Sequence, residues 1–93
     1  MKTQKFKSVW DAIEDTKSEA ASMRARSEIM IVLHEKIKSL NTTQIKASEA
    51  LGITQPRLND LLQGKINKFS LDALFDIAEK ANIIIGITLK KAA

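Results

Sequence analysis

Apolar residues recur at helical spacing through the first half of the chain and predict two consecutive helices. A short helix is expected to begin at Ser8, with Asp11 three positions later as its capping partner. Thr16 and Glu19 repeat this capping pattern, so we predict that a second helix starts there and runs to about residue 40. Its apolar stripe comprises Met23, Met30, Leu33, Ile37 and Leu40.

The apolar surface of this second helix is wider than a single face. Ile29, Ile31 and Val32 surround Met30 and extend the surface beyond the stripe. A surface of this width predicts that another element packs on it. The sequence leaves two candidates open, which are the short first helix and a second subunit.

Three shorter helices are predicted in the second half of the chain. Each follows a hydroxyl residue that can accept a hydrogen bond from the first turn, and each stops at a residue that tolerates a left-handed backbone. The predicted starts are Thr43, Thr54 and Ser70, and the predicted ends are Gly52, Gly64 and Asn82. Pro56 fits the first turn of the middle helix, where its missing N–H has no partner to lose.

Residues 83–89 differ in character, because most of them are β-branched, and they predict one short strand. The chain offers no second strand to pair with it, so we predict antiparallel pairing with the same strand of another copy. The dimerisation residues on this interpretation are Ile83, Ile84, Ile85, Ile87 and Leu89. The fold class is therefore predicted to be all-α, a bundle of about five helices with one C-terminal strand paired across a dimer.

The length and composition are typical of one small globular domain. The chain has 93 residues, of which 44% are hydrophobic, 28% are charged and none is cysteine. We expect a flexible basic tail over residues 1–7 and a single domain over residues 8–93. The apolar runs are too short to span a membrane and no secretory signal follows Met1, so a cytoplasmic protein is the expectation.

The charge is moderately basic, with 15 Lys and Arg against 11 Asp and Glu and a net charge of +4. The excess lies between residues 21 and 68, whereas both ends of the chain are balanced. A basic middle is compatible with a polyanionic partner such as nucleic acid, but many solvated surfaces have the same balance. The charge alone therefore does not indicate a nucleic-acid partner, and the sequence motifs have to distinguish the two cases.

The stretch over residues 43–65 carries the clearest functional pattern. A helix-turn-helix needs a small residue on its first helix, a glycine at the turn, and apolar residues that fix the second helix across the first. Ser48, Gly52 and Ile53 meet the first requirements, and Leu58 and Leu61 meet the last. The second helix then exposes polar side chains able to hydrogen-bond with base edges in a major groove.

At this point the chain resembles the lambda-repressor-like (XRE) helix-turn-helix family, and within it the HigA-type antitoxins that accompany RelE/ParE-like toxins. The resemblance covers about residues 9–89 and includes the terminal isoleucine-rich strand. It implies a homodimer that binds a palindromic double-stranded operator, represses its own operon and neutralises a toxin protein. The matching runs are Thr43-Gln44, Leu51-Gly52-Ile53-Thr54-Gln55-Pro56-Arg57-Leu58, Leu61-Leu62-x-Gly64-Lys65 and Phe69-Ser70-Leu71-Asp72-x-Leu74.

The candidate DNA-binding residues lie at the two helix starts of the motif, along the second helix and just after it. They are Thr43, Gln44, Lys46, Thr54, Gln55, Pro56, Arg57, Asn59, Asp60, Lys65 and Lys68. The lysines are expected to contact phosphates, and the polar residues of the second helix are expected to contact bases. Asp60 departs from this scheme, because a phosphate would repel it; it is expected to face a cytosine amine or solvent.

Other readings of the sequence are weaker. His34 is the single histidine and is expected at the edge of the core, so no metal site is predicted. The carboxylates Glu14, Asp15 and Glu19 lie near helix ends, where they favour the helix dipole, and no enzyme or cofactor is predicted. Two rivals to an antitoxin remain, a repressor of the same fold without a toxin partner and a helical protein-interaction module.

Overall fold

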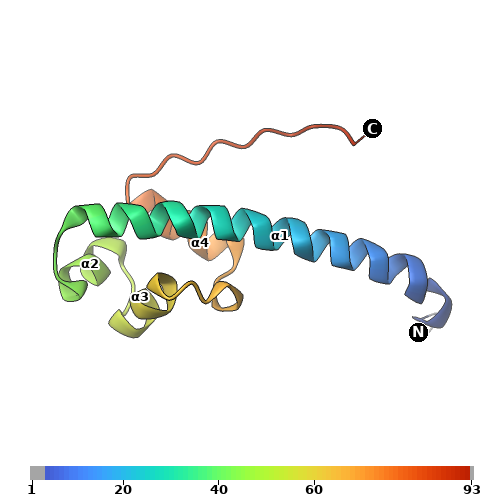
Figure 1. The fold of residues 1–93 in the computed structure, drawn as a ribbon, viewed down its shortest axis with the longest axis horizontal. Helices are drawn as coiled ribbons and strands as arrows, with labels where there is room; N and C mark the ends of the chain where they lie inside the picture. Colours follow the sequence, from blue (N-terminus) through green and yellow to red (C-terminus); the bar gives the residue numbers. More distant parts are fainter. Residues whose placement is uncertain (1–3, 93) are drawn as a thin grey trace.

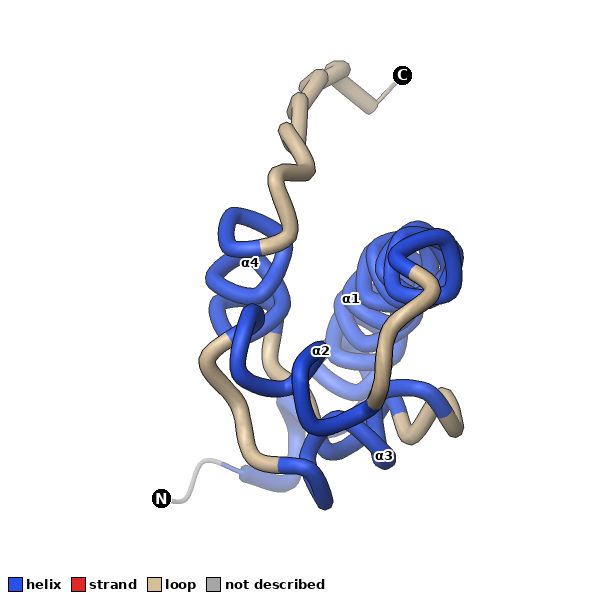
Figure 2. The backbone as a smooth tube through the Cα atoms, turned by 90° about the vertical axis from the view of Figure 1, so that its left-hand side faces the viewer, coloured by secondary structure: helices blue, strands red, loops and turns tan. Residues whose placement is uncertain are grey.

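The computed structural model describes the backbone of residues 4–92 and the side chains of residues 17–92. One long helix carries three short helices along its C-terminal half, and an extended segment completes the chain (Figure 1). The elements are α1 (Gln4–Leu40), α2 (Gln44–Leu51), α3 (Gln55–Leu62), the 3-10 turn η1 (Ile66–Lys68) and α4 (Leu71–Lys80). Seen along α1, the helices α2 and α3 lie below α4, and α1 lies beside α4 and above α3 (Figure 2).

The structure shows one helix, α1, where the sequence predicted two. The capping pattern at Thr16 does not interrupt the helix, because a Thr-x-x-Glu sequence can cap a helix but does not break one. Only Gly or Pro would strongly oppose continuation, and residues 4–40 contain neither. The described bundle therefore has four α-helices. Residues 4–7, which the sequence assigned to a tail, belong to α1, and residues 1–3 lie outside the described part of the chain.

The three short helices begin where their hydroxyl caps predicted. Thr43 Oγ1 accepts the amide of Lys46 at 3.2 Å, and Thr54 Oγ1 accepts the amide of Arg57 at 3.2 Å. The same contact joins Ser70 Oγ to the third amide of α4, at 3.1 Å. Each bond satisfies one of the amides that a helix start leaves without a partner.

Two glycines close α2 and α3 in the same way. Gly52 and Gly64 have φ values of +68° and +73°, a conformation that a side chain disfavours. After Gly52 the amide of Ile53 returns to Ser48 O at 3.0 Å, and after Gly64 the amide of Lys65 returns to Asp60 O at 3.1 Å. This closure reverses the chain sharply at both sites, which sets the crossing of α2 and α3 and the path of the loop after α3.

The core lies between the C-terminal half of α1 and the three short helices. Its buried apolar residues are Met30, Leu33, Ile37, Ala47, Leu51, Leu58, Leu61, Phe69, Leu74, Ile77, Ala78 and Ala81. Ser48 is the polar member among the described residues, and its hydroxyl donates to Ile45 O at 2.8 Å. Met23 and Leu40, which the sequence placed in the apolar stripe, are instead each 42% exposed, and Ile45 of α2 is 53% exposed. Met23 and Leu40 lie on α1 at the two ends of its buried stretch, where the short helices no longer cover it.

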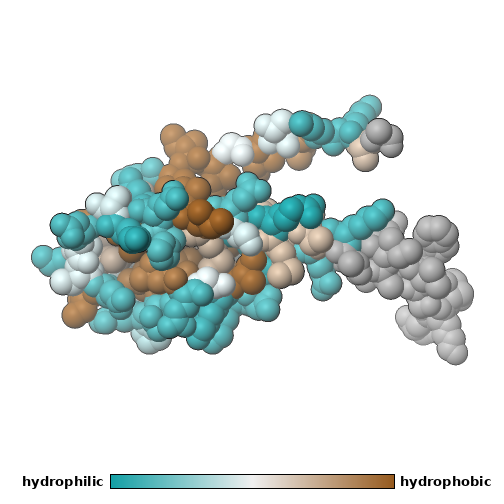
Figure 3. All heavy atoms as spheres, viewed as in Figure 1, coloured by the Kyte–Doolittle hydropathy of each residue, from teal (hydrophilic) through white to brown (hydrophobic). Residues whose placement is uncertain are grey.

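Residues 83–92 form neither helix nor strand in the structure, which holds a single chain. This segment leaves α4 and runs back in the direction of the N-terminal half of α1 (Figure 1). Ile83 and Ile85 pack against the core, whereas Ile84, Ile87 and Leu89 are 96%, 67% and 88% exposed. Hydrophobic atoms gather where the segment leaves the helices (Figure 3). The predicted strand does not form in this single chain, because a strand needs a partner strand. Pairing with a second copy stays a prediction.

Candidate nucleic-acid interface

The helices α2 and α3 form a helix-turn-helix around the turn at residues 52–54. Ser48 and Leu51 of α2 and Leu58 and Leu61 of α3 are buried, so these four side chains fix the crossing of the two helices. The opposite side of α3 and the start of α2 are open to solvent. This arrangement presents the second helix as a rigid projecting element, which is what insertion into a DNA groove requires.

The start of α3 gathers the predicted base-contacting residues on the surface. Thr54, Gln55, Pro56 and Asn59 are all exposed. Gln55 and Asn59 are four positions apart and therefore share one helical face. Both amides can donate and accept at once, which is the chemistry that reads an adenine edge in the major groove.

The start of α2 provides a second exposed group. Thr43 caps α2, Gln44 and Lys46 lie in its first turn, and all three are solvent-exposed. A helix start carries partial positive charge and free amides, so it attracts phosphate oxygens. Their position suits the contacts with the DNA backbone that the sequence predicted for them.

Arg57 does not lie with Gln55 and Asn59. Its guanidinium donates a 2.8 Å hydrogen bond from Nη1 to Lys68 O, and the guanidinium carbon lies 4.2 Å from the centre of the Phe69 ring. The side chain is half-buried and connects α3 to the segment around η1. Arg57 therefore has an intramolecular role that its position in the motif did not indicate.

Asp60 likewise has protein partners. Its Oδ1 lies 3.3 Å from Lys65 Nζ and its Oδ2 lies 3.7 Å from Lys68 Nζ. Each carboxylate oxygen thus holds one of the two lysines that the sequence assigned to phosphate contacts. The structure brings Arg57, Asp60, Lys65 and Lys68 together into one group, which we call the α3–η1 charge cluster.

Two residues important to this region were not among the site residues that the sequence predicted. Arg26 of α1 donates from Nη1 to Ile66 O at 3.2 Å and to Phe69 O at 3.3 Å. Phe69, which is 1% exposed, contacts both arginines: its carbonyl accepts from Arg26, and its ring lies under the guanidinium of Arg57. A buried aromatic directly before a capping serine could have indicated Phe69 as core, but the pairing with Arg26 spans more than 40 positions and has no local pattern.

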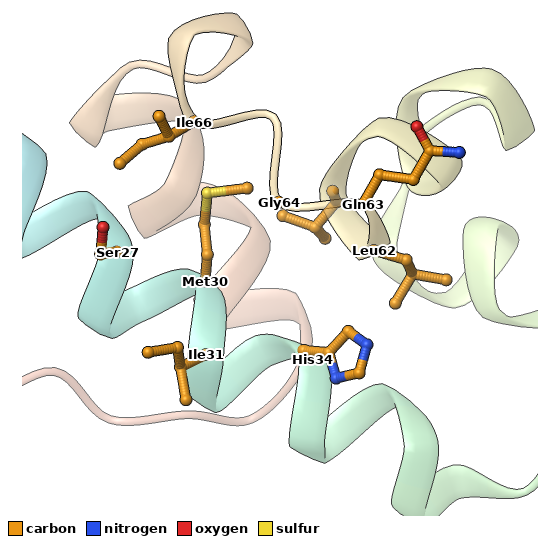
Figure 4. Close-up of a pocket in the computed structure, with 9 residues that line it drawn as sticks. Ser27, Met30, Ile31, His34, Leu62, Gln63, Gly64 and Ile66 are labelled. Carbon is orange, nitrogen blue, oxygen red and sulfur yellow. The ribbon is translucent and has the colours of Figure 1, made fainter.

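A groove lies beside the motif, between α1 and the end of α3. It has a volume of about 390 Å³ and is lined by Met30, Ile31 and His34 on one side and by residues 61–64 and Ile66 on the other (Figure 4). His34 is half-buried there, at the edge of the core as the sequence predicted. Gln63 borders this groove at the C-terminal end of α3, opposite the exposed start of the helix, and its side chain points away from α1 (Figure 4).

No group of three His, Cys, Asp or Glu side chains in the described residues could hold a metal ion. No helix described there is long and apolar enough to cross a membrane.

These features define a helical domain with a projecting helix-turn-helix. A family model described as a helix-turn-helix domain matches residues 12–90, so the chain belongs to this family of helix-turn-helix domains. No curated protein matches the chain. The family and the geometry together indicate a DNA-binding regulator, and domains of this family are typically not enzymes.

Proposed function

We propose that the protein is a sequence-specific transcriptional repressor that binds a palindromic double-stranded operator as a homodimer. The exposed pair Gln55 and Asn59 carries the proposal, because a capped helix start holds both amides on one projecting face. Thr43, Gln44 and Lys46 at the start of α2 supply backbone contacts that hold α3 in the major groove. The remaining base-side contacts come from Thr54 and Pro56.

Binding to a fluorescent duplex from the chain's own upstream region tests this function. Gln55→Ala and Asn59→Ala should each weaken operator binding by about 1 to 3 kcal/mol and leave binding to a scrambled duplex unchanged. Gln63→Ala is the matched control, since this exposed glutamine caps the C-terminal end of α3, away from Gln55 and Asn59. Equal losses on both duplexes, or no loss in either variant, would refute base reading by α3.

The proposed biological role is that of the antitoxin of a type II toxin-antitoxin pair, with a RelE/ParE-like toxin as its partner. This part rests on the resemblance of residues 43–74 and of the isoleucine-rich C-terminal segment to HigA-type antitoxins. Co-expression with the neighbouring gene tests it. A stable complex that relieves growth arrest supports the antitoxin, whereas operator binding without any such complex supports a repressor that has no toxin.

A further inference from the structure

The ion pairs of the α3–η1 charge cluster occupy the two lysines that a phosphate would need. Lys65 and Lys68 each approach a different oxygen of Asp60, at 3.3 Å and 3.7 Å. The side chain of Asp60 is 21% exposed, whereas those of Lys65 and Lys68 are 46% and 57% exposed. The carboxylate thus belongs to the least exposed side chain of the three, whereas both lysine side chains stay accessible to an approaching anion.

The backbone around these lysines is held independently of the ion pairs. Arg57 binds the carbonyl of Lys68, and Arg26 binds the carbonyls of Ile66 and Phe69. The amide of Lys65 returns to Asp60 O at the end of α3. Loss of the carboxylate contact would therefore free the lysine side chains without moving the loop that carries them.

We propose that Asp60 is an exchangeable counter-ion, which holds Lys65 and Lys68 until a DNA phosphate takes its place. This inference rests on the proposed DNA-binding function and concerns the control of that site. The exchange requires no covalent step: the lysines leave one anion for another, and a solution cation then accompanies the carboxylate. Because surface ion pairs are weak, the lysines can exchange readily.

The consequence is a reduced attraction for DNA of any sequence. With the carboxylate in place, the two lysines contribute one net positive charge to the approaching phosphates instead of two. A genome offers a vast excess of non-specific sites, so a lower background affinity leaves more protein free for the operator. Asp60 is then a positioning residue, because it changes the affinity for DNA only through Lys65 and Lys68.

Salt titrations of binding to a random-sequence duplex test this role. Asp60→Asn removes the charge with little change in shape, and it should raise affinity roughly five- to tenfold at 0.1 M salt and steepen the log–log salt slope by about 0.9. Asp76→Asn is the matched control, because Asp76 is exposed on α4 beside the C-terminal segment and has the same charge. Its effect should be less than about twofold, since screening weakens a distant exposed charge.

The decisive comparison repeats Asp60→Asn in a Lys65→Gln/Lys68→Gln background. If Asp60 acts through the lysines, the gain should vanish there; an equal gain in both backgrounds would show simple repulsion of DNA and overturn the exchange. Circular dichroism checks that each variant is folded. If Asp60→Asn unfolds the chain, the same comparison in both backgrounds is made with Asp60→Ser. Failure of the unmodified protein to bind any duplex would instead count against the proposed function itself.

Discussion

The guanidinium of Arg57 lies on the ring of Phe69, with 4.2 Å between the guanidinium carbon and the ring centre, and so joins the exposed motif to the core. Arg57 belongs to the second helix of the motif, and Phe69 is fully buried beneath it. Because the same guanidinium also binds Lys68 O, one side chain fixes the loop after α3 by two different contacts. A residue that the sequence assigned to DNA contacts thus ties the second helix of the motif to the core.

We predict that Arg57→Ala lowers the free energy of unfolding by about 1 to 2 kcal/mol, the sum expected for a cation–π contact and a hydrogen bond. Arg57→Lys should recover less than half of the lost stability, because an ammonium is not planar and cannot stack on the Phe69 ring while it donates to Lys68 O. Urea denaturation measures both, with Gln55→Ala as an exposed control on the same helix. An unchanged midpoint in Arg57→Ala would mean that the contacts do not persist in solution.

The turn of the motif provides a second prediction. Gly52→Ala should destabilise the protein by about 1 to 2 kcal/mol, because its φ of +68° is unfavourable for a residue with a side chain. An added β-carbon would lie 2.9 Å from Lys80 Nζ, but this flexible side chain can move aside. The cost should therefore come from the backbone and not from crowding.

Substitutions at two other glycines distinguish backbone strain from crowding, and thermal or urea denaturation measures their effects on stability. Gly64→Ala has a similar φ of +73° with nothing within 4 Å of the new carbon, so it should cost about as much as Gly52→Ala. Gly86→Ala, in open space without a positive φ, should change stability by less than about 0.5 kcal/mol. A large loss at Gly52 with none at Gly64 would show that crowding by Lys80 dominates.

The features that the sequence predicted well are those with local causes. Thr43, Thr54 and Ser70 cap helices through bonds to residues three positions away, and Gly52 and Gly64 reverse the chain within a few residues. Each of these signals is complete within one turn of helix. The helix-turn-helix could therefore be placed before the structure was known.

The features that the sequence did not predict depend on partners far apart in the sequence or on the absence of a helix-breaking residue. Arg57 and Arg26 converge on residues 66–69, whose position is set only by the packing of α1 against η1. The pairing of Asp60 with Lys65 and Lys68 depends on the return of the chain at Gly64. At Thr16 the capping pattern was present but the helix continued, since nothing there prevents continuation.

The lysines provide a prediction about electrostatics. Lys46 lies exposed in the first turn of α2, where a phosphate contact is expected. Lys46→Ala should make the log–log salt slope of operator binding shallower by about 0.9, as expected for the loss of one phosphate contact. Lys90→Ala, an exposed lysine in the C-terminal segment, is the control and should leave the slope unchanged. If binding were independent of salt, contact with the DNA backbone would be excluded.

The C-terminal segment provides the last prediction, which concerns the dimer. Ile84, Ile87 and Leu89 are largely exposed, and residues 83–86 border a small apolar groove with Ile29 and Val32 of α1. Pairing with a second copy would bury this surface and join the unpaired backbone into a two-stranded sheet. It would also set the separation of the two α3 helices, which should be about 34 to 36 Å for half-sites one DNA turn apart.

Deletion of the residues after Asn82 tests this arrangement. The shortened chain should remain helical, because most of the core belongs to α1–α4, but it should sediment as a monomer and bind the operator at least tenfold more weakly. Ile84→Lys is a milder second variant, since this side chain is 96% exposed in one chain and the change should disrupt only the pairing. A dimer that persists in both variants would place the interface elsewhere, with the exposed Ile31 and Val32 of α1 as the first surface to examine.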